Sequence, residues 1–413
     1  MEISFILGIL GGYKMKKILQ SGLSLAIGAV LGIIILWVIG FDNMDRMNFW
    51  QYTLAFGLIG VGTYFILIFT TIIHEAGHLV CGLMSGYGFF SFRVLSFTFC
   101  KYEDKFKIKR FAIPGTGGQC LMAPPEYNDG NFKYKLYLAG GNMATFILFA
   151  IEVMIVAVTG IDTFIGRFVL LTAVISLYLL LLNAIPMKLG GIANDAFDLK
   201  SLGKNPEHKK EFWLSLDVNA KTNRGALLSE VGIDFDAIDD DELMKEIDGI
   251  AIQIKLNIKV NYLIGEKRFE EAYTLCKKLL DEKAVIELYK YELKCDKMFL
   301  EIVLGKEGKV KKTYSDELKL YINKTHKYMI TRMRLMYAYY LLIEKDEAKA
   351  LKEKEAFEKA CLRYPDLGEI KNEKALMEYI DSIHKNNMEA TKNTEINDSM
   401  EADTNEETVE KEA

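Results

Sequence analysis

The sequence contains few of the residues that bind metals or cross-link a fold. It has only five histidines, six cysteines and six prolines among 413 residues. The cysteines are scattered without any C-x-x-C spacing, which excludes a disulfide framework and a cysteine-based zinc knuckle and indicates reduced thiols. Lys and Arg number 51 against 56 Asp and Glu. This balance gives no sign of nucleic-acid binding.

Charge is scarce in the first half of the chain. Residues 1 to about 190 are apolar with few charges, whereas the remainder is rich in Lys, Glu and Asp. The uncharged runs 18–41 and 52–73 are each long enough to cross a bilayer core of about 30 Å. Two further spans are predicted at 136–161 and 163–186. The predicted fold class is therefore mostly α: a polytopic membrane protein with about four transmembrane helices, followed by a soluble α-helical domain.

Basic residues orient the predicted spans. Lys14, Lys16 and Lys17 precede the first span, and the loop 86–133 carries seven basic residues against four acids. By the positive-inside rule, both segments lie on the cytoplasmic side. We expect an integral protein of a bacterial cell membrane, in contact with the lipid bilayer, with both termini in the cytoplasm. Met15 is a second plausible start.

The cytoplasmic loop also contains a strand pattern. From Phe89 to Phe99 and from Lys105 to Ile113, aromatic and β-branched residues alternate with polar ones around a turn at Glu103-Asp104. This alternation predicts a membrane-associated β-hairpin. The following run, Pro114 to Cys120, has three glycines in four residues and is interpreted as too flexible for a helix or a strand.

The second span ends in His74-Glu75-Ala76-Gly77-His78, an H-E-x-x-H motif. Histidines four residues apart lie on one face of a helix, about 6 Å from each other, which suits two corners of a tetrahedral zinc site. The intervening Glu75 can act as general base on a water held by the metal. Ionisable groups at membrane depth are costly, so we interpret the motif as functional.

A zinc site needs a third protein ligand. The fourth span ends near Asn183, and the chain then leads through a Gly-Gly pair to Asn194-Asp195. We choose Asp195 as the third ligand. Asp198, one helical turn further on, is the alternative, and both acids can also be read as simple helix caps.

These residues together resemble the site-2 protease family of intramembrane zinc metalloproteases. The similarity covers about residues 52–200: the H-E-x-x-H helix, the β-hairpin, the Gly-rich, Asn-containing start of the next helix, and an N-x-x-P followed by an aspartate. The resemblance implies that His74, His78 and Asp195 hold Zn²⁺ and that Glu75 activates water. The family pattern has Leu-Asp-Gly soon after the proline, whereas this chain has Asn194-Asp195-Ala196 several residues later.

The resemblance also implies a substrate path. The Gly-rich loop of the family, which lines this path, corresponds to the predicted strands and to the run that contains Gly115, Gly117 and Gly118. Asn142 and Asn183 match asparagines of the family and are assigned to gating or substrate positioning. A helical substrate must unwind before cleavage, and an exposed strand edge could pair with the unwound segment by β-addition.

The second half of the chain has a helical period. Residues 261–280 and 336–364 each resemble a tetratricopeptide-like helical hairpin, with a generic helical bundle as the alternative. We hypothesise that this domain recruits substrates or docks a cytosolic regulator. The predicted divisions are an N-terminal segment with an anchor helix (1–51), a metalloprotease core (52–200), a cytosolic helical domain (201–385) and a disordered acidic tail (386–413).

The sequence thus favours an intramembrane zinc metalloendopeptidase that cleaves a membrane-tethered protein or peptide near the cytoplasmic face, in regulated proteolysis. One alternative is a protease that processes leader peptides or signal-peptide remnants, which the motif does not distinguish. Another is a catalytically silent membrane scaffold that presents the helical domain. A transporter is a third option, but four spans without an internal repeat argue against it.

Overall fold

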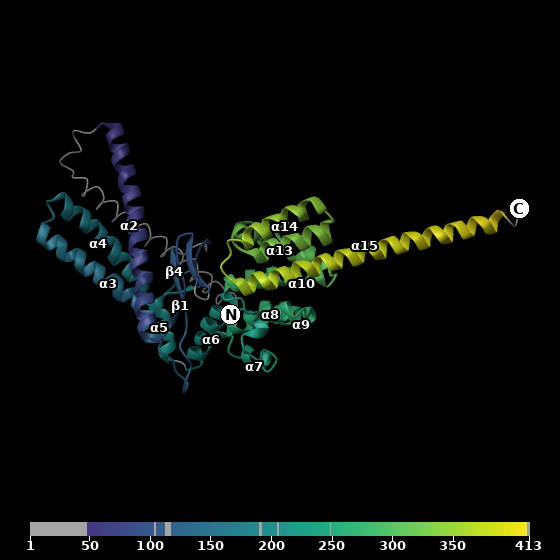
Figure 1. Cartoon of the computed structure of the whole chain (residues 1–413), viewed down its shortest axis with the longest axis horizontal. Coiled ribbons are helices and arrows are strands. Elements are labelled where there is room, and N and C mark those ends of the chain that lie inside the picture. The colour runs from purple at the N-terminus through teal and green to yellow at the C-terminus, as the bar shows by residue number, and fades with distance from the viewer. Residues whose placement is uncertain are drawn as a thin grey trace, which may run out of the picture. The chain divides into compact units, whose positions relative to one another are not determined.

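The computed structural model describes residues 48–102, 105–111, 117–189, 192–204, 206–247 and 249–410 (Figure 1). The first predicted span, 18–41, lies outside these residues. The chain divides into two compact units. The first unit comprises residues 1–81, 135–187 and 193–199, and the second comprises 82–134, 188–192 and 200–413.

The described residues of the first unit form three long apolar helices: α2 (Phe49–Met84), α3 (Tyr134–Thr159) and α4 (Phe164–Ala184). Each contains a stretch long and apolar enough to cross a membrane, and in α2 this stretch is Gly60–Met84. The three helices coincide with three of the predicted spans, although α2 continues well past residue 73. Large apolar side chains such as Leu54, Phe65 and Val158 are exposed on their surfaces. Such surfaces suit a lipid environment.

Glycines bring α2 and α3 into backbone contact. A Cβ added at Gly77 would lie within 3.0 Å of the Gly140 carbonyl and of Ala144, and a Cβ added at Gly140 would meet Gly77 and Cys81 equally closely. Small residues at a crossing allow two membrane helices to approach closely. The tight crossing therefore depends on Gly77 and Gly140 and lies within the H-E-x-x-H segment.

A short two-stranded ladder leads from α4 to the next helix. β5 (Lys188–Leu189) pairs with β6 (Ile192–Ala193), and α5 (Asp195–Lys204) begins directly afterwards. Asp195 is therefore the first residue of α5. The N-terminal turn of a helix favours a negative charge, because unpaired backbone N–H groups face it.

The predicted β-hairpin is in fact a four-stranded antiparallel sheet in the second unit. Its strands are β1 (Gly88–Val94), β2 (Phe97–Tyr102), β3 (Lys105–Arg110) and β4 (Gly118–Ala123), in the order β3-β2-β1-β4. The first predicted strand is broken at Leu95, whose φ of 53° reverses the chain so that Val94 pairs with Phe97.

The sheet also corrects the interpretation of the glycine-rich run. Its last residues belong to β4, where Gly118 pairs with Val94 and Cys120 with Phe92. Pairing with β1 therefore holds this segment in a strand, although its glycine-rich composition does not favour one. Tyr102 pairs with Lys105, and the predicted turn at 103–104 lies outside the described residues.

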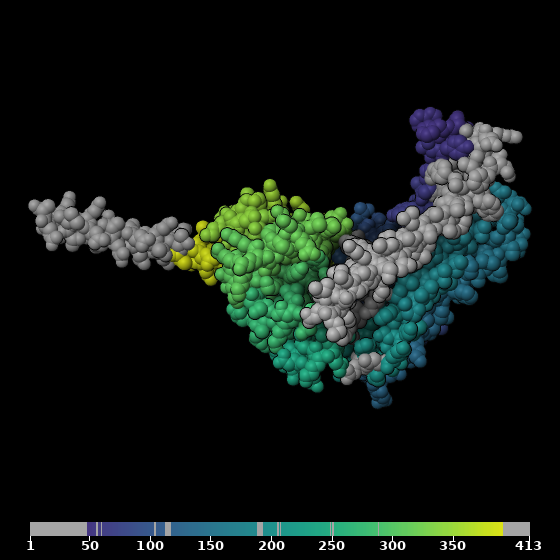
Figure 2. Space-filling model, turned by 180° about the vertical axis from the view of Figure 1, so that it is seen from behind, coloured from purple at the N-terminus to yellow at the C-terminus, as the bar shows by residue number. Residues whose placement is uncertain are grey.

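The rest of the second unit is helical. Its helices are α6 (Pro206–Asn223), η2 (Leu228–Glu230), α7 (Asp240–Met244), α8 (Ile250–Gly265), α9 (Phe269–Asp281), α10 (Glu287–Val303), α11 (Glu307–Thr313), α12 (Asp316–Thr325), η3 (His326–Tyr328), α13 (Ile330–Ala338), η4 (Tyr339–Glu344), α14 (Glu347–Cys361) and α15 (Leu367–Glu410). Figure 2 shows the teal and green helices of this unit as one closely packed body of side chains.

One apolar core joins the helices from α8 to α15, whereas Val218 of α6 belongs to a smaller, separate cluster. The larger core includes Leu256, Phe299, Ile330, Phe357 and Leu376, all nearly inaccessible to solvent. The sheet packs onto the same unit: β4 lies against α6, the Trp213 indole donates to the Pro125 carbonyl at 2.7 Å, and the Tyr102 hydroxyl donates to the Pro365 carbonyl at 2.6 Å.

Two helical hairpins occupy the segments that the sequence marked as hairpins. One is α8 with α9, and the other is α13 and η4 with α14. Their turns contain Lys267 and Lys345, both with positive φ. Their likeness to tetratricopeptide repeats stays a prediction. α15 continues as a helix to Glu410 and so includes most of the segment that we expected to be disordered.

Candidate metal centre

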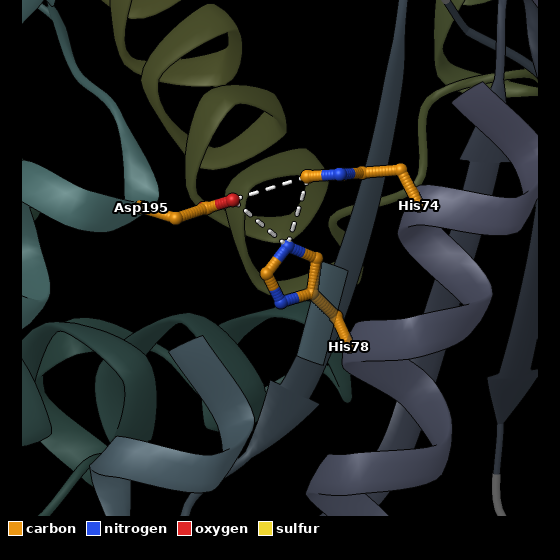
Figure 3. Close-up of side chains that lie close together, drawn as sticks. All are labelled: His74, His78 and Asp195. Atoms are coloured by element: carbon orange, nitrogen blue, oxygen red, sulfur yellow. Dashed lines mark hydrogen bonds and ion pairs between the residues drawn. The ribbon is translucent and has the colours of Figure 1, made fainter. Parts of the chain in front are cut away.

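Three donor atoms converge in the first unit. The Asp195 Oδ2 lies 3.1 Å from the Nε2 of His74 and 3.3 Å from the Nε2 of His78, and the two Nε2 atoms are 3.2 Å apart. Figure 3 shows the three side chains pointing toward one another, the histidines from α2 and the aspartate from the start of α5. Both histidines are buried and Asp195 is partly exposed. The structure thus brings together residues that are more than 110 positions apart in the chain.

The outer ring nitrogens of the histidines have fixed partners. The His78 Nδ1 lies 2.8 Å from the Tyr137 carbonyl, which can only accept, so this nitrogen carries the proton. The His74 Nδ1 lies 3.1 Å from the Thr145 hydroxyl, whose own proton goes to the Gly141 carbonyl at 2.9 Å. His74 is therefore also protonated on Nδ1. Both Nε2 lone pairs face the centre, which is the arrangement of metal-binding histidines with outer hydrogen-bond partners.

The electrostatics of the group favour a bound cation. Two imidazole lone pairs and one carboxylate oxygen lie within hydrogen-bond distance, and without a cation or proton between them they repel. Burial alone would raise the pKa of Asp195, but the hydrogen bonds that His74 and His78 donate when they also carry a proton on Nε2 outweigh burial and hold that pKa below its usual range. Asp195 is thus an anionic ligand at neutral pH.

The spacing of the donors can be compared with that of a metal site. Ligands about 2.0–2.1 Å from a tetrahedral ion are separated by roughly 3.3 Å. The observed separations of 3.1, 3.2 and 3.3 Å match this value. The buried His74–His78–Asp195 group could therefore bind a metal ion, with a fourth position left for another ligand.

Gly141 of α3 leaves the space beside the donors open. A Cβ at this position would lie 2.6 Å from the His74 Nε2 and closer still to the His78 Nε2. The Gly-rich start of this helix is part of the family resemblance, but nothing in the sequence places Gly141 against the histidines. The two outer partners, the Thr145 hydroxyl and the Tyr137 carbonyl, were not predicted either. The only signal for either in the sequence was their position on the same predicted span.

Asn194 positions Asp195. Its side-chain oxygen accepts from the backbone N–H groups of Met187 and Phe197 at 3.2 and 3.0 Å, so it caps α5. Its side-chain nitrogen donates to the carbonyls of Leu182 and Ile185 at 2.6 and 2.7 Å, at the end of α4. This buried asparagine therefore ties the start of α5 to the end of α4.

The predicted alternative ligand, Asp198, and the predicted general base, Glu75, lie near Asp195 and His74 in the sequence. Asp198 is half-buried one turn further along α5, and it does not belong to the group of converging donors in the described part of the chain. Glu75 is half-buried on α2, directly after His74. Of the two predicted candidates for the third ligand, the donor geometry favours Asp195.

The residues assigned to the substrate path fall into two groups. In the first unit, the Asn142 amide donates to the Asn183 carbonyl at 3.2 Å, and its Oδ1 is buried without a hydrogen-bond partner among the described residues. In the second unit, Gly117 accepts from the Leu95 N–H at 2.9 Å and Gly118 begins β4. Gly115 lies outside the described residues.

Fold and site together define a class: a mostly helical protein whose described residues include three helices able to cross a membrane and a buried His-His-Asp group able to bind a metal. No family model matches the chain, and no curated protein or solved structure matches it either.

Proposed function

We propose that the chain is an intramembrane zinc metalloendopeptidase of the site-2 protease type, which cleaves a membrane-tethered protein near the cytoplasmic face. The observation that carries the proposal is the convergence, at tetrahedral spacing, of the Asp195 Oδ2 at the start of α5 with the Nε2 atoms of two histidines on the apolar helix α2. That helix also carries Glu75 within an intact H-E-x-x-H motif. Histidines with a carboxylate are a common ligand set of catalytic zinc.

Each residue has a distinct role in this reaction. His74, His78 and Asp195 would hold the zinc, which when bound acidifies a water molecule and polarises a peptide carbonyl. The Glu75 carboxylate accepts a proton from the attacking water and later delivers it to the nitrogen of the leaving peptide. The hydrogen bonds of Thr145 and Tyr137 keep both imidazoles in the tautomer that the roles of His74 and His78 require.

Asn142 supplies a binding group for the substrate. A transmembrane helix must unwind to expose the bond to be cleaved, and unwinding leaves backbone N–H groups without acceptors inside the bilayer. The Asn142 Oδ1 is a buried acceptor without a partner in the described structure, one residue from Gly141 at the metal centre. We therefore assign it to an N–H of the unwound substrate.

The first test measures metal in the purified full-length protein in detergent. We expect about one zinc per chain in the wild type, as in other single-zinc sites, and little in His78→Ala or Asp195→Ala. Asp198→Asn is the matched control and should keep its zinc. A folded wild-type protein that binds no zinc would contradict the proposal, and full occupancy in Asp195→Ala would move the third ligand elsewhere.

The second test separates a protease from a silent scaffold. A single-span reporter with a fluorophore and a quencher around the inner end of its span is incubated with wild type and Glu75→Gln. We expect Glu75→Gln to retain zinc and to lose cleavage by roughly 100-fold or more, the usual contribution of a general base. Equal cleavage by both proteins would remove Glu75 from the reaction. A zinc-loaded wild type that cleaves no member of a reporter panel would favour the scaffold.

A further inference from the structure

A cavity of about 280 Å³ lies within the second unit, whereas the donors described above belong to the first. Helices α6, α8, α10, α13 and α15, which can be followed in Figure 1, all contribute to its wall. Its size is close to the lower end of small-molecule sites, about 300 Å³. Several of its lining residues are polar or charged, among them Asn219, Asn261, Asp296, Arg332 and Asn372.

Negative charge predominates in the cavity wall, and most of it has partners. Six lining residues are acidic and Arg332 is the one lining base, in the part of the chain that the structure describes. Arg332 pairs with Glu292, and Arg334, just behind the wall, pairs with Glu373. Asp366 accepts from the Thr222 hydroxyl at 2.8 Å, and Glu369 accepts from the Tyr364 hydroxyl at 3.0 Å.

Glu266 is exposed, and among the other acids of the wall Asp296 is the exception. Its side chain is only 7% exposed and lines the cavity, yet the described structure contains no hydrogen bond or ion pair to its carboxylate. Burial raises its pKa to about 7, although the charges of Arg332 and Arg334 oppose this rise. An unpaired buried carboxylate is expensive to retain. A structural role would normally give it a partner, so its position indicates a ligand.

The asparagines of the wall add a second recognition element. The side chains of Asn219 and Asn372 make no hydrogen bond to other described residues, and Asn261 uses only its nitrogen, toward Asn257. A carboxamide offers both donors and an acceptor, which match the carbonyl and N–H of a peptide group. The wall therefore combines one buried carboxylate that has no partner among the described residues with several amides that have free hydrogen-bonding groups.

We propose that this cavity binds a ligand bearing an ammonium or guanidinium group, with the cation on Asp296 and the adjoining polar groups on the asparagines. The cation comes either from a basic side chain of a peptide or from a free amine. Charge-assisted hydrogen bonds from such a group satisfy the buried carboxylate. The inference concerns the second unit alone and does not depend on the function proposed for the metal centre.

The test uses calorimetric titration of the full-length protein in detergent at low ionic strength, where charge interactions are least screened. The probes are acetyl-glycyl-lysyl-glycinamide, its arginine analogue, spermidine and agmatine, with the norleucine tripeptide as neutral control. We expect saturable binding of the basic probes and not of the neutral one. Asp296→Asn should weaken it at least tenfold, the usual effect of losing a charged hydrogen bond. Asp281→Asn, an exposed carboxylate outside the cavity wall, should not change it.

The probes identify the source of the cation. Binding of the tripeptides without the free amines indicates a peptide ligand, and the reverse indicates an amine. The melting temperature of ligand-free Asp296→Asn should equal or exceed that of wild type, since the variant removes an unpaired buried charge.

If Asp296→Asn does not fold, Asn372→Ala tests the proposal instead. The half-buried Asn372 side chain makes no hydrogen bond to other described residues, so its removal should leave the fold intact. It should weaken tripeptide binding several-fold. Failure of every basic probe to saturate overturns the proposal. Undiminished binding in folded Asp296→Asn, or in Asn372→Ala, does so too.

Discussion

Replacing Gly141 of α3 by alanine tests whether the two histidines of the candidate metal centre lie where the structure places them. The new methyl group would lie 2.6 Å from the His74 Nε2 and closer to the His78 Nε2, whereas real Cβ atoms keep at least 3.0 Å from such neighbours. The imidazoles must therefore move by at least about 0.4 Å, and a metal site tolerates deviations of about 0.2 Å in its bond lengths. Such a movement also strains the outer bonds to Thr145 and Tyr137.

We therefore expect Gly141→Ala to weaken metal binding more than the loss of an outer partner does, which costs about 10–100-fold. The measurement is zinc occupancy of the detergent-purified protein against a series of chelator-buffered free zinc concentrations, with circular dichroism to verify the helices. Gly60→Ala on α2 is the matched control, because a Cβ there meets nothing within 4 Å. Its occupancy curve should coincide with that of wild type. A wild-type curve for folded Gly141→Ala would refute the donor geometry described above.

Four further outcomes follow from the same contacts. Thr145→Val removes the acceptor of the His74 Nδ1–H and should lower zinc affinity about 10–100-fold in the same titration, whereas Thr145→Ser should keep it. Asn194→Ala removes the cap of α5 and the hydrogen bonds of this side chain to the end of α4. It should lower the thermal midpoint and the zinc occupancy together. The free energy of unfolding should fall by about 1–3 kcal/mol for each buried group left unpaired. Glu373→Gln leaves Arg334 buried without its partner and should cost about 3–5 kcal/mol in urea unfolding, much of which an Arg334→Met, Glu373→Leu double variant should recover. The pKa of Asp296 is raised to about 7 from 3.8, so the folded state holds a proton that the unfolded chain has released, and stability falls as pH rises between these values. The stability difference between Asp296→Asn and wild type should therefore grow over this range in thermal melts; a constant difference would contradict the raised pKa.

The local sequence pattern was sufficient to predict those features of the molecule that depend only on residues close together in the chain. The apolar runs 52–73, 136–161 and 163–186 predict three of the helices, because a segment that crosses a bilayer needs apolar side chains wherever the rest of the chain lies. The H-E-x-x-H motif predicts a pair of donors, because residues four apart share a helix face. The sequence also identifies Asp195 and Asp198 as candidate ligands after the fourth predicted span. It does not show which of the two carboxylates lies closer to the histidines.

The strands show where local pattern fails. The alternation from Phe89 to Phe99 reads as one strand, and only the positive φ of Leu95 turns it into two. The glycine-rich run reads as a loop, yet pairing with β1 makes Gly118–Ala123 a strand. Strand identity is a property of the pair and not of the segment, so a single stretch of sequence under-determines it.

By itself, the sequence determined the apolar helices, the charged second half and two of the three metal donors, because each follows from periodicity and composition within one segment. Only the tertiary structure shows that Gly77 and Gly140 allow α2 and α3 to touch. It alone shows that Asn194 holds the start of α5, and with it Asp195, against the end of α4. It also shows that Asp296 lines a cavity between helices without a partner among the described residues. These features depend on which backbone and side-chain groups from distant segments meet, and that is settled by packing the whole chain.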